Sequence, residues 1–144
     1  MRYLVLIITV LLLFSSCSEY QKALKSEDVK VKYDLAEKLY NDGKYKKANR
    51  LFEQIVPQFV GKPQGERIIY FFADSYYKTE DYYLAAYQFE RFSKSYPKSD
   101  KAQEAAFHGA KSYYMLSPKF YIDQTETKTA IDKLQAFINT YPDS

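Results

Sequence analysis

The side chains that could support catalysis are few and stand apart in this sequence. The single histidine, His108, lies far from the single cysteine, Cys17, and no set of carboxylates at ligand spacing surrounds it, so neither a metal site nor a nucleophile–base pair is predicted. The four glycines form no phosphate-binding loop, and no Gly-x-Ser-x-Gly motif occurs. We expect the acidic residues at solvent-facing or turn positions: Glu37, Glu53, Asp74, Glu80 and Asp81. The sequence therefore predicts a binding protein and no enzyme.

Cys17 is the one residue for which a covalent reaction is expected. As the only cysteine of the chain it cannot form an internal disulfide. It directly follows an apolar run and two small residues, and Leu13-Phe14-Ser15-Ser16-Cys17 resembles a bacterial lipobox, with Phe14 where an aliphatic residue is usual. In a lipobox the thiol is lipidated and the cysteine becomes the first residue of the mature chain. A covalent lipid on Cys17 is thus predicted, and no other cofactor; the alternative is a free thiol behind an ordinary signal.

The first residues have the order typical of a secretory signal. A positive Met1-Arg2 precedes a run of 12 residues, Tyr3 to Phe14, all apolar except Thr9, which as a helix would rise only about 18 Å, short of the roughly 30 Å hydrocarbon core. We therefore expect residues 1–16 to be a cleaved signal peptide and the polar residues 17–28 to be a lipidated tether. Ser18, by resemblance to lipoprotein sorting in enteric bacteria, favours the outer membrane. The remaining 20 basic and 18 acidic side chains are interleaved, which does not indicate nucleic-acid binding.

An internal repeat organises residues 29–144. A shift of 37 residues carries Ala36 to Ala73 and then to Ala110, and the tyrosines that follow these alanines keep the same phase. After Tyr114 an insertion of 8 residues changes the shift to 45, which carries Ala85 to Ala130. Within each unit the apolar residues recur three and four apart, so each unit is predicted to be a pair of amphipathic helices. The sequence therefore predicts an all-α solenoid.

The repeat resembles the tetratricopeptide repeat. Small alanines at 36, 73, 110, 48, 85 and 130 allow close helix approach, Phe52, Phe89 and Phe92 fill the space beside them, and Pro97 and Pro142 end the second helices. The predicted units are residues 29–62, 64–98 and 100–144, about three helix hairpins after the cleaved signal peptide. Because no polar capping helix follows Pro142, we expect either a longer protein, truncated at its C-terminal end, or a partner that covers this end.

The resemblance implies a ligand-binding groove lined by the first helix of each unit. Tyr33, Tyr70 and Phe107 would form one aromatic row, and Tyr40, Tyr77 and Tyr114 a second row. Cations would stand between the rows at Arg67, Lys78 and Lys111. Such a surface suits an extended peptide with aromatic or apolar anchors. A packing role for Tyr40, Tyr77 and Tyr114 is the alternative to ligand contact.

A lipobox followed by tyrosine-rich repeats resembles the BamD family, the lipoprotein subunit of the outer-membrane barrel-assembly machinery. The resemblance lies in Ala85-x-x-x-Phe89-x-x-Phe92-x-x-x-Tyr96-Pro97 and in the corresponding segment from Asp123 through Ala130 to Tyr141-Pro142. It implies a lipid-anchored protein on the periplasmic side of the outer membrane. The implied partners are unfolded outer-membrane proteins, whose final strand ends in an aromatic residue, and the barrel-forming, BamA-like subunit.

Members of the BamD family have about five repeats, and the C-terminal ones dock the barrel-forming subunit. This chain is thus expected to keep substrate contact and to lose much of the docking surface. The first alternative is another tetratricopeptide envelope lipoprotein, a scaffold in cell division or wall synthesis. The second is a secreted peptidase or a sugar-binding accessory protein; the missing catalytic sets disfavour the peptidase.

Overall fold

The computed structural model describes residues 19–144, and in this part of the chain the secondary structure is helical throughout. Residues 19–25 form a first helix. The elements that follow are α2 (Val29–Asn41), α3 (Tyr45–Ile55), the 3₁₀ turn η1 (Val56–Gln58), α4 (Gly65–Lys78), α5 (Tyr82–Ser95), α6 (Ala102–Met115) and α7 (Thr125–Thr140). No helix among the described residues is both long and apolar enough to cross a membrane.

The local sequence explains where the helices of the first pair begin and end. The Asp28 side chain accepts a 2.8 Å hydrogen bond from the backbone N–H of Lys30, which caps the start of α2. Gly43 has a φ of +73°, and the backbone N–H of the next residue, Lys44, donates to the Leu39 carbonyl at 2.8 Å. This left-handed turn satisfies the last carbonyls of α2 and reverses the chain into α3.

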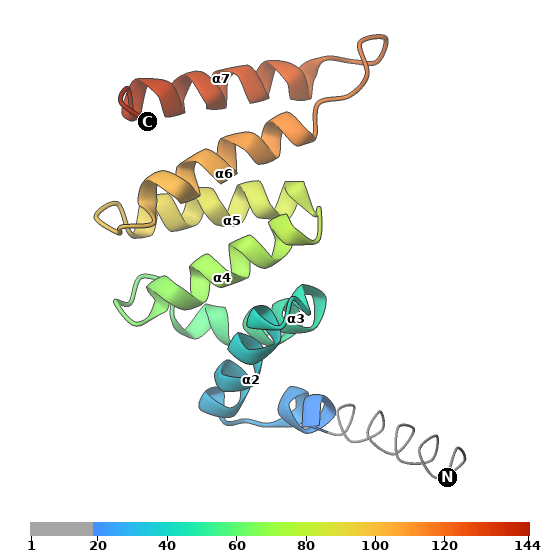
Figure 1. Ribbon diagram of the computed structural model, residues 1–144, viewed down its shortest axis with the longest axis vertical. Helices are drawn as coiled ribbons and strands as arrows, with labels where there is room; N and C mark the ends of the chain where they lie inside the picture. Colours follow the sequence, from blue (N-terminus) through green and yellow to red (C-terminus); the bar gives the residue numbers. More distant parts are fainter. Residues whose placement is uncertain (1–18) are drawn as a thin grey trace, which may run out of the picture.

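The helices stack in chain order along the long axis of the molecule, from α2 near the bottom of Figure 1 to α7 at the top. Each helix packs on the next, and the first helices of neighbouring pairs also touch, α2 on α4 and α4 on α6. The pairs α2–α3, α4–α5 and α6–α7 fall within the three predicted units. The predicted all-α solenoid is therefore confirmed.

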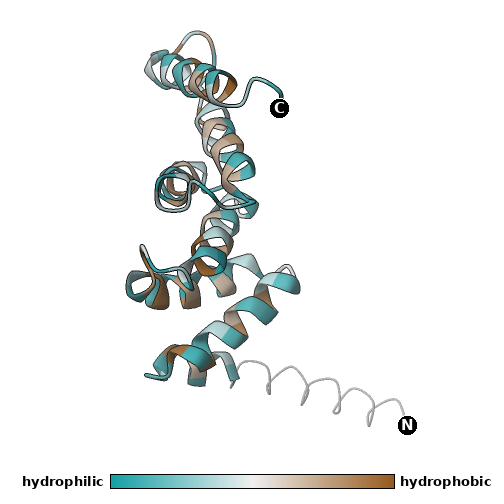
Figure 2. Cartoon of the chain, turned by 90° about the vertical axis from the view of Figure 1, so that its left-hand side faces the viewer, coloured by the Kyte–Doolittle hydropathy of each residue, from teal (hydrophilic) through white to brown (hydrophobic). Residues whose placement is uncertain are grey.

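The core follows the predicted positions. The six repeat alanines are all buried, and Phe52, Phe89 and Phe92 have no exposed surface. Hydrophobic and hydrophilic residues alternate along the helices in Figure 2, as expected where each helix buries one side. Alanine leaves room for neighbouring helices to approach, and the phenylalanine rings fill the space beside it. Because Ala36, Ala73 and Ala110 are buried, they fix which side of each first helix faces the core, and the predicted site lies on these helices.

The joint between the first two pairs depends on Tyr96 and Gly65. The Tyr96 hydroxyl donates to the Lys62 carbonyl at 2.9 Å, which ties the end of α5 to the loop before α4. A Cβ added to Gly65 would lie 2.2 Å from the Phe59 carbonyl oxygen and 2.7 Å from the Tyr96 hydroxyl. Only a residue without a side chain fits this close approach.

The predicted tether is wrong for residues 19–25. These residues form a helix whose Tyr20 and Ala23 side chains are buried in the common core, and Lys47 lies over the Tyr20 ring, 5.4 Å from its centroid. The two apolar residues are three apart, so they share a face, and α2 and the start of α3 give that face something to pack against. Cys17 and the predicted signal peptide, residues 1–16, lie outside the described residues.

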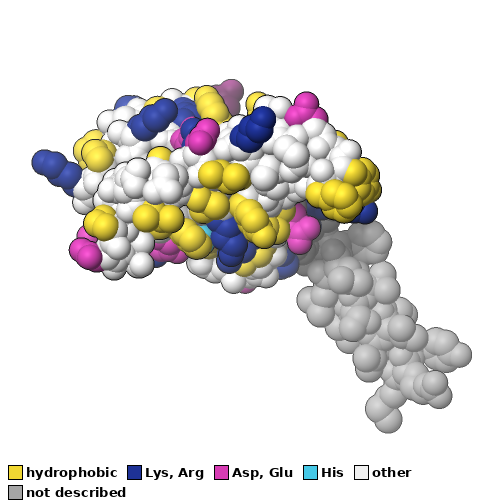
Figure 3. Space-filling view, turned by 90° about the horizontal axis from the view of Figure 1, so that it is seen from above, with side chains coloured by type: hydrophobic (Ala, Val, Ile, Leu, Met, Phe, Trp, Pro, Cys, Tyr) yellow, Lys and Arg dark blue, Asp and Glu magenta, His cyan; other side chains and the backbone are white. Residues whose placement is uncertain are grey.

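The third pair is less tightly closed than the first two. The inserted residues form a loop, 116–124, between α6 and α7, and Ala130 is the only residue of α7 that is buried. The apolar side chains of Ile131 and Ile138 are exposed on the same helix. Figure 3, which views the stack from its α7 end, shows hydrophobic side chains scattered among charged ones on this surface.

Candidate functional site

The predicted binding residues lie on the consecutive first helices α2, α4 and α6. Their side chains make contacts across both unit boundaries, in one group at each boundary, and the two groups together are here called the first-helix face. Its members are partly or fully exposed and are linked by the contacts described below: Tyr33, Glu37, Tyr40, Arg67, Phe71, Tyr77, Phe107, His108 and Lys111.

At the α2 end of this face, Glu37 organises two predicted residues. The Tyr33 hydroxyl donates to Glu37 Oε1 at 3.2 Å, and the Arg67 guanidinium forms an ion pair with the same carboxylate across the unit boundary. Arg67 also lies over the Phe71 ring, 5.2 Å from its centroid. A cation over an aromatic ring is attracted by the electron-rich ring face. The structure thus brings Tyr33 and Arg67 together on one carboxylate.

Tyr40 joins the first two units in a way that the sequence did not indicate. Its ring stacks on Phe71 with centroids 4.3 Å apart, and its hydroxyl donates to Asp74 Oδ2 at 2.5 Å. Asp74 is only 3% exposed, so the expectation that it faces solvent is wrong. Burial, followed by the bond to this carboxylate, raises the pKa of the Tyr40 hydroxyl far above its usual value, so Tyr40 remains a hydrogen-bond donor. This tyrosine therefore packs and links units, which was the alternative to ligand contact.

Tyr70 does not belong to the exposed surface, and its predicted place in an aromatic row is wrong. It is 7% exposed, and its ring packs edge-on against Phe89 and Phe92, at 6.0 and 5.5 Å between centroids. Hydrogen bonding to Lys101 and to the Tyr70 hydroxyl lowers the pKa of the Glu104 carboxyl. The ring is buried because α4 is covered on this side by α5 and α6. Tyr33 and Phe107 are therefore separated by a core residue.

At the α6 end the face holds a second group of aromatic rings and a cation. The Tyr77 ring stacks on His108 with centroids 4.8 Å apart, and Phe107 lies beside His108 at 5.8 Å. Lys111 Nζ stands 6.0 Å from the Tyr77 centroid and 5.8 Å from that of Phe107. Burial lowers the pKa of His108 although nearby carboxylates oppose the change, so the imidazole is neutral at pH 7. The predicted residues Tyr77, Phe107 and Lys111 are thus brought together.

Two predicted residues lie at the margin of the surface. Lys78 at the end of α4 and Tyr114 near the end of α6 are both exposed. Lys78 is near enough to His108 for its charge to oppose protonation of the imidazole. Three residues of the face, Phe71, Glu37 and His108, were not among the predicted site residues. The four-residue spacing of Arg67 and Phe71 on one helix was the signal for the first, because residues at i and i+4 are neighbours.

The chemistry available on this face is non-covalent. It offers ring faces, two cations and hydroxyl donors, spread over three helices. Among residues 19–144 no group of three or more histidine, cysteine or acidic side chains is placed to hold a metal ion. The His108 ring is stacked between aromatic neighbours, and its nearest charged groups are carboxylates and lysines. Such a surface can hold a peptide by its apolar side chains and meet its carboxylates with Arg67 and Lys111.

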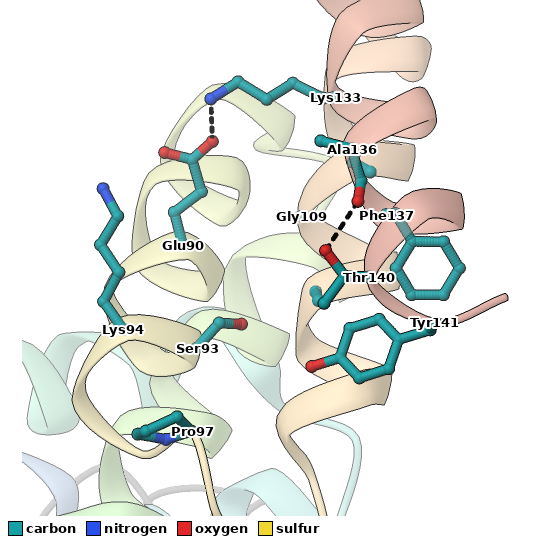
Figure 4. A pocket seen from close by; sticks show the side chains of 12 residues that line it. Glu90, Ser93, Lys94, Pro97, Gly109, Lys133, Ala136, Phe137, Thr140 and Tyr141 are labelled. Carbon is teal, nitrogen blue, oxygen red and sulfur yellow. Dashed lines mark hydrogen bonds and ion pairs between the residues drawn. The ribbon is translucent and has the colours of Figure 1, made fainter.

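A cleft of about 450 Å³ lies elsewhere, between α5, α6 and α7. Figure 4 shows Glu90, Lys94 and Pro97 on one side of it and Phe137, Thr140 and Tyr141 on the other. Lys133 Nζ bonds Glu90 Oε1 at 2.6 Å across the opening, and the Thr140 hydroxyl donates to the Ala136 carbonyl at 2.8 Å. None of the predicted site residues lines this cleft.

The stacked hairpins define the class of the molecule as a tetratricopeptide-like solenoid. A comparison with known families identifies it further: the chain belongs to the YfiO family of outer membrane lipoproteins, which matches residues 25–144. YfiO is the BamD family, which the sequence resembles. It is a family of lipoproteins and not a known enzyme family. A comparison with curated proteins gave no match.

Proposed function

We propose that this protein is a lipid-anchored subunit of the outer-membrane β-barrel assembly machinery, which binds unfolded outer-membrane proteins and the barrel-forming subunit. The family match supports an outer membrane lipoprotein. The first-helix face supports the binding of extended chains. The lipid is carried by Cys17, and it holds the repeats on the periplasmic side of the outer membrane. Two or more acyl chains at this residue give firm attachment, since each buried methylene contributes about 0.8 kcal/mol.

The observation that carries the binding function is the group formed by Tyr77, Phe107 and Lys111. Phe107 is partly exposed, and Lys111 stands between its ring and that of Tyr77. An aromatic side chain of a ligand can pack on Phe107, while a carboxylate next to it pairs with Lys111. A chain that ends in an aromatic residue has both groups on the same residue. Barrel proteins, through their final strand, would thus be suitable ligands.

The test uses a peptide that ends in phenylalanine, and the same peptide with a C-terminal amide. The Phe107→Ala and Lys111→Met variants should each bind the free-acid peptide roughly tenfold more weakly, the range for an interface anchor. Lys111→Met should not change the affinity for the amide, because the missing carboxylate leaves the lysine without a partner. Fluorescence anisotropy measures the affinities, and circular dichroism verifies that the helix content is unchanged.

Tyr87→Ala is the matched control, since Tyr87 is also exposed but lies on α5, outside the first-helix face. It should leave binding within about twofold of the parent chain. Equal losses from Tyr87→Ala and Phe107→Ala, or full affinity in Phe107→Ala, would remove the support for this face as the binding site.

A further inference from the structure

The loop between α6 and α7 exposes three large apolar side chains to solvent. Phe120 is 90% exposed, Tyr121 67% and Ile122 52%, although the three are consecutive. The rings of Phe120 and Tyr121 contact each other edge-on at 5.4 Å. A single exposed apolar residue is ordinary, but three adjacent ones at the tip of a loop indicate an interaction surface. These three residues are here called the aromatic tip.

Two backbone carbonyls at the tip of this loop accept hydrogen bonds from within the loop. The Gln124 side-chain amide donates to the Lys119 carbonyl at 3.0 Å and to the Ile122 carbonyl at 2.7 Å. The Ile122 N–H donates to the same Lys119 carbonyl at 3.0 Å. Carbonyls that already have partners lose little when water is removed from around them. The Lys119 and Ile122 carbonyls, which flank the two rings in the sequence, can therefore leave water at low cost.

The aromatic tip lies on the edge of the solenoid at which the described chain begins. The turns within the three pairs, α2–α3, α4–α5 and α6–α7, share one edge, at the right of Figure 1. Glu19 and Tyr20 lie beside Asp42 and Lys44 of the first of these turns. Tyr83, at the second turn, lies beside Leu116 and Ile122 of the third. Cys17 is two residues before Glu19 in the sequence, so at most about 7 Å of backbone separates a lipid on it from this edge.

The charges around the aromatic tip nearly cancel. Lys119 and Lys128 are balanced by Asp123 and Glu126, and the Asp123 carboxylate is already bonded to Thr125 at the start of α7. A protein partner chosen by charge has little to recognise here. The consecutive residues Lys119, Phe120 and Tyr121 instead match the interface of a bilayer, where amphipathic rings lie at the level of the headgroups.

We propose that the aromatic tip is a second membrane contact, which inserts into the headgroup region of the bilayer that holds the lipid on Cys17. The inference rests on the proposed lipid anchor. With two contacts on one edge, the solenoid lies along the membrane and its orientation is fixed. Because the local charge is close to zero, insertion depends on apolar surface, so it occurs in uncharged phosphatidylcholine and changes little with salt.

The test uses the full chain, lipidated on Cys17 and reconstituted into phosphatidylcholine vesicles. Since the only native thiol carries the lipid, a cysteine introduced by Tyr121→Cys can be labelled specifically with an environment-sensitive dye. The dye should show blue-shifted emission and resist quenching by iodide. Val60→Cys is the matched control, because Val60 is an exposed apolar residue in the loop between η1 and α4, on the opposite edge of Figure 1. A dye at this position should keep the emission of a water-exposed dye and be quenched by iodide.

A second comparison keeps the Tyr121→Cys dye and removes apolar surface. Phe120→Ser with Ile122→Ser should return the emission to its aqueous value, whereas Ile138→Ser, an exposed position near the other end of α7, should not. Flotation of the vesicles separates the two proposals. If the protein floats with the vesicles but the dye on Tyr121→Cys has the emission of a water-exposed dye, the membrane contact is refuted and the proposed anchor stands. Protein that does not float overturns both, and a blue shift without vesicles shows that another protein surface covers the tip and overturns the inference.

Discussion

Removing one hydroxyl group, by Tyr40→Phe, should destabilise the protein by about 2 kcal/mol. The Tyr40 hydroxyl donates at 2.5 Å to Asp74, whose carboxylate is 3% exposed and receives no other side-chain hydrogen bond among the described residues. Hydrogen bonds to charged groups are worth about 1.5–3 kcal/mol. Tyr40 is half-buried, which lets water replace part of the loss and places the expected cost near the middle of this range. The ring stack on Phe71 is unchanged, so the cost reports the hydroxyl alone.

Urea unfolding followed by far-ultraviolet circular dichroism measures this cost. Tyr40→Phe should lower the midpoint and leave the slope unchanged, because the surface exposed on unfolding is the same. In a double-mutant cycle with Asp74→Ala, the coupling energy between the two side chains should be about 1.5 kcal/mol or more. Tyr114→Phe, which removes an exposed hydroxyl, is the control and should change stability by less than about 0.5 kcal/mol. A Tyr40→Phe variant as stable as Tyr114→Phe would refute the assignment of Asp74 as a buried, hydrogen-bonded carboxylate.

Two further predictions concern the joint between units and the half-buried His108. Gly65→Ala should lower the unfolding free energy by at least about 2 kcal/mol, because its Cβ would lie 2.2 Å from the Phe59 carbonyl oxygen; a melting temperature equal to that of the parent chain would contradict this. Burial lowers the pKa of His108 below its ordinary value of 6.5, so the unfolded chain binds this proton more readily than the folded one. Unfolding free energy should thus fall as the pH drops from about 6.5, and His108→Gln should flatten that part of the stability curve; a curve unchanged by the substitution would exclude this role.

The fold could be predicted from the sequence because its signal is repeated. Ala36, Ala73 and Ala110 occupy the same place in three helices, and each is buried. A periodicity of three and four residues identifies a helix and its buried side with no knowledge of the neighbouring helix. Repetition then requires that neighbours stack in the same way. Both inferences use only local spacing, which is why they were correct.

The site could be predicted less well, because a helix in a solenoid has neighbours on several sides. Tyr33, Tyr70 and Phe107 hold equivalent positions in the repeat, yet Tyr70 is in the core while Phe107 is partly exposed. Within residues 19–144 the middle unit has a helix hairpin on each side, whereas each outer unit has one on a single side. Periodicity gives the direction of a side chain from its own helix. It does not give what the next unit places there.

Polar residues were misjudged for the same reason. Asp74 was expected in solvent because carboxylates are seldom buried, and Tyr40 in the preceding unit provides the hydrogen bond that allows its burial. The polar composition of residues 18–28 predicted a tether, but two apolar side chains, Tyr20 and Ala23, are enough to dock the helix at 19–25. In both cases the deciding contact comes from a residue distant in sequence.

The links between units and the residues offered to a ligand are the same side chains. Arg67 pairs with Glu37 across the first boundary, and Tyr77 stacks on His108 across the second. A ligand carboxylate that engages Arg67 must compete with Glu37, and a ring that packs beside Tyr77 adds to a stack that already joins α4 to α6. Binding therefore changes the contacts that set the angle between neighbouring hairpins. The same side chains contact the neighbouring unit and would contact a ligand. We therefore expect the curvature of the solenoid to change slightly when the first-helix face binds an extended chain.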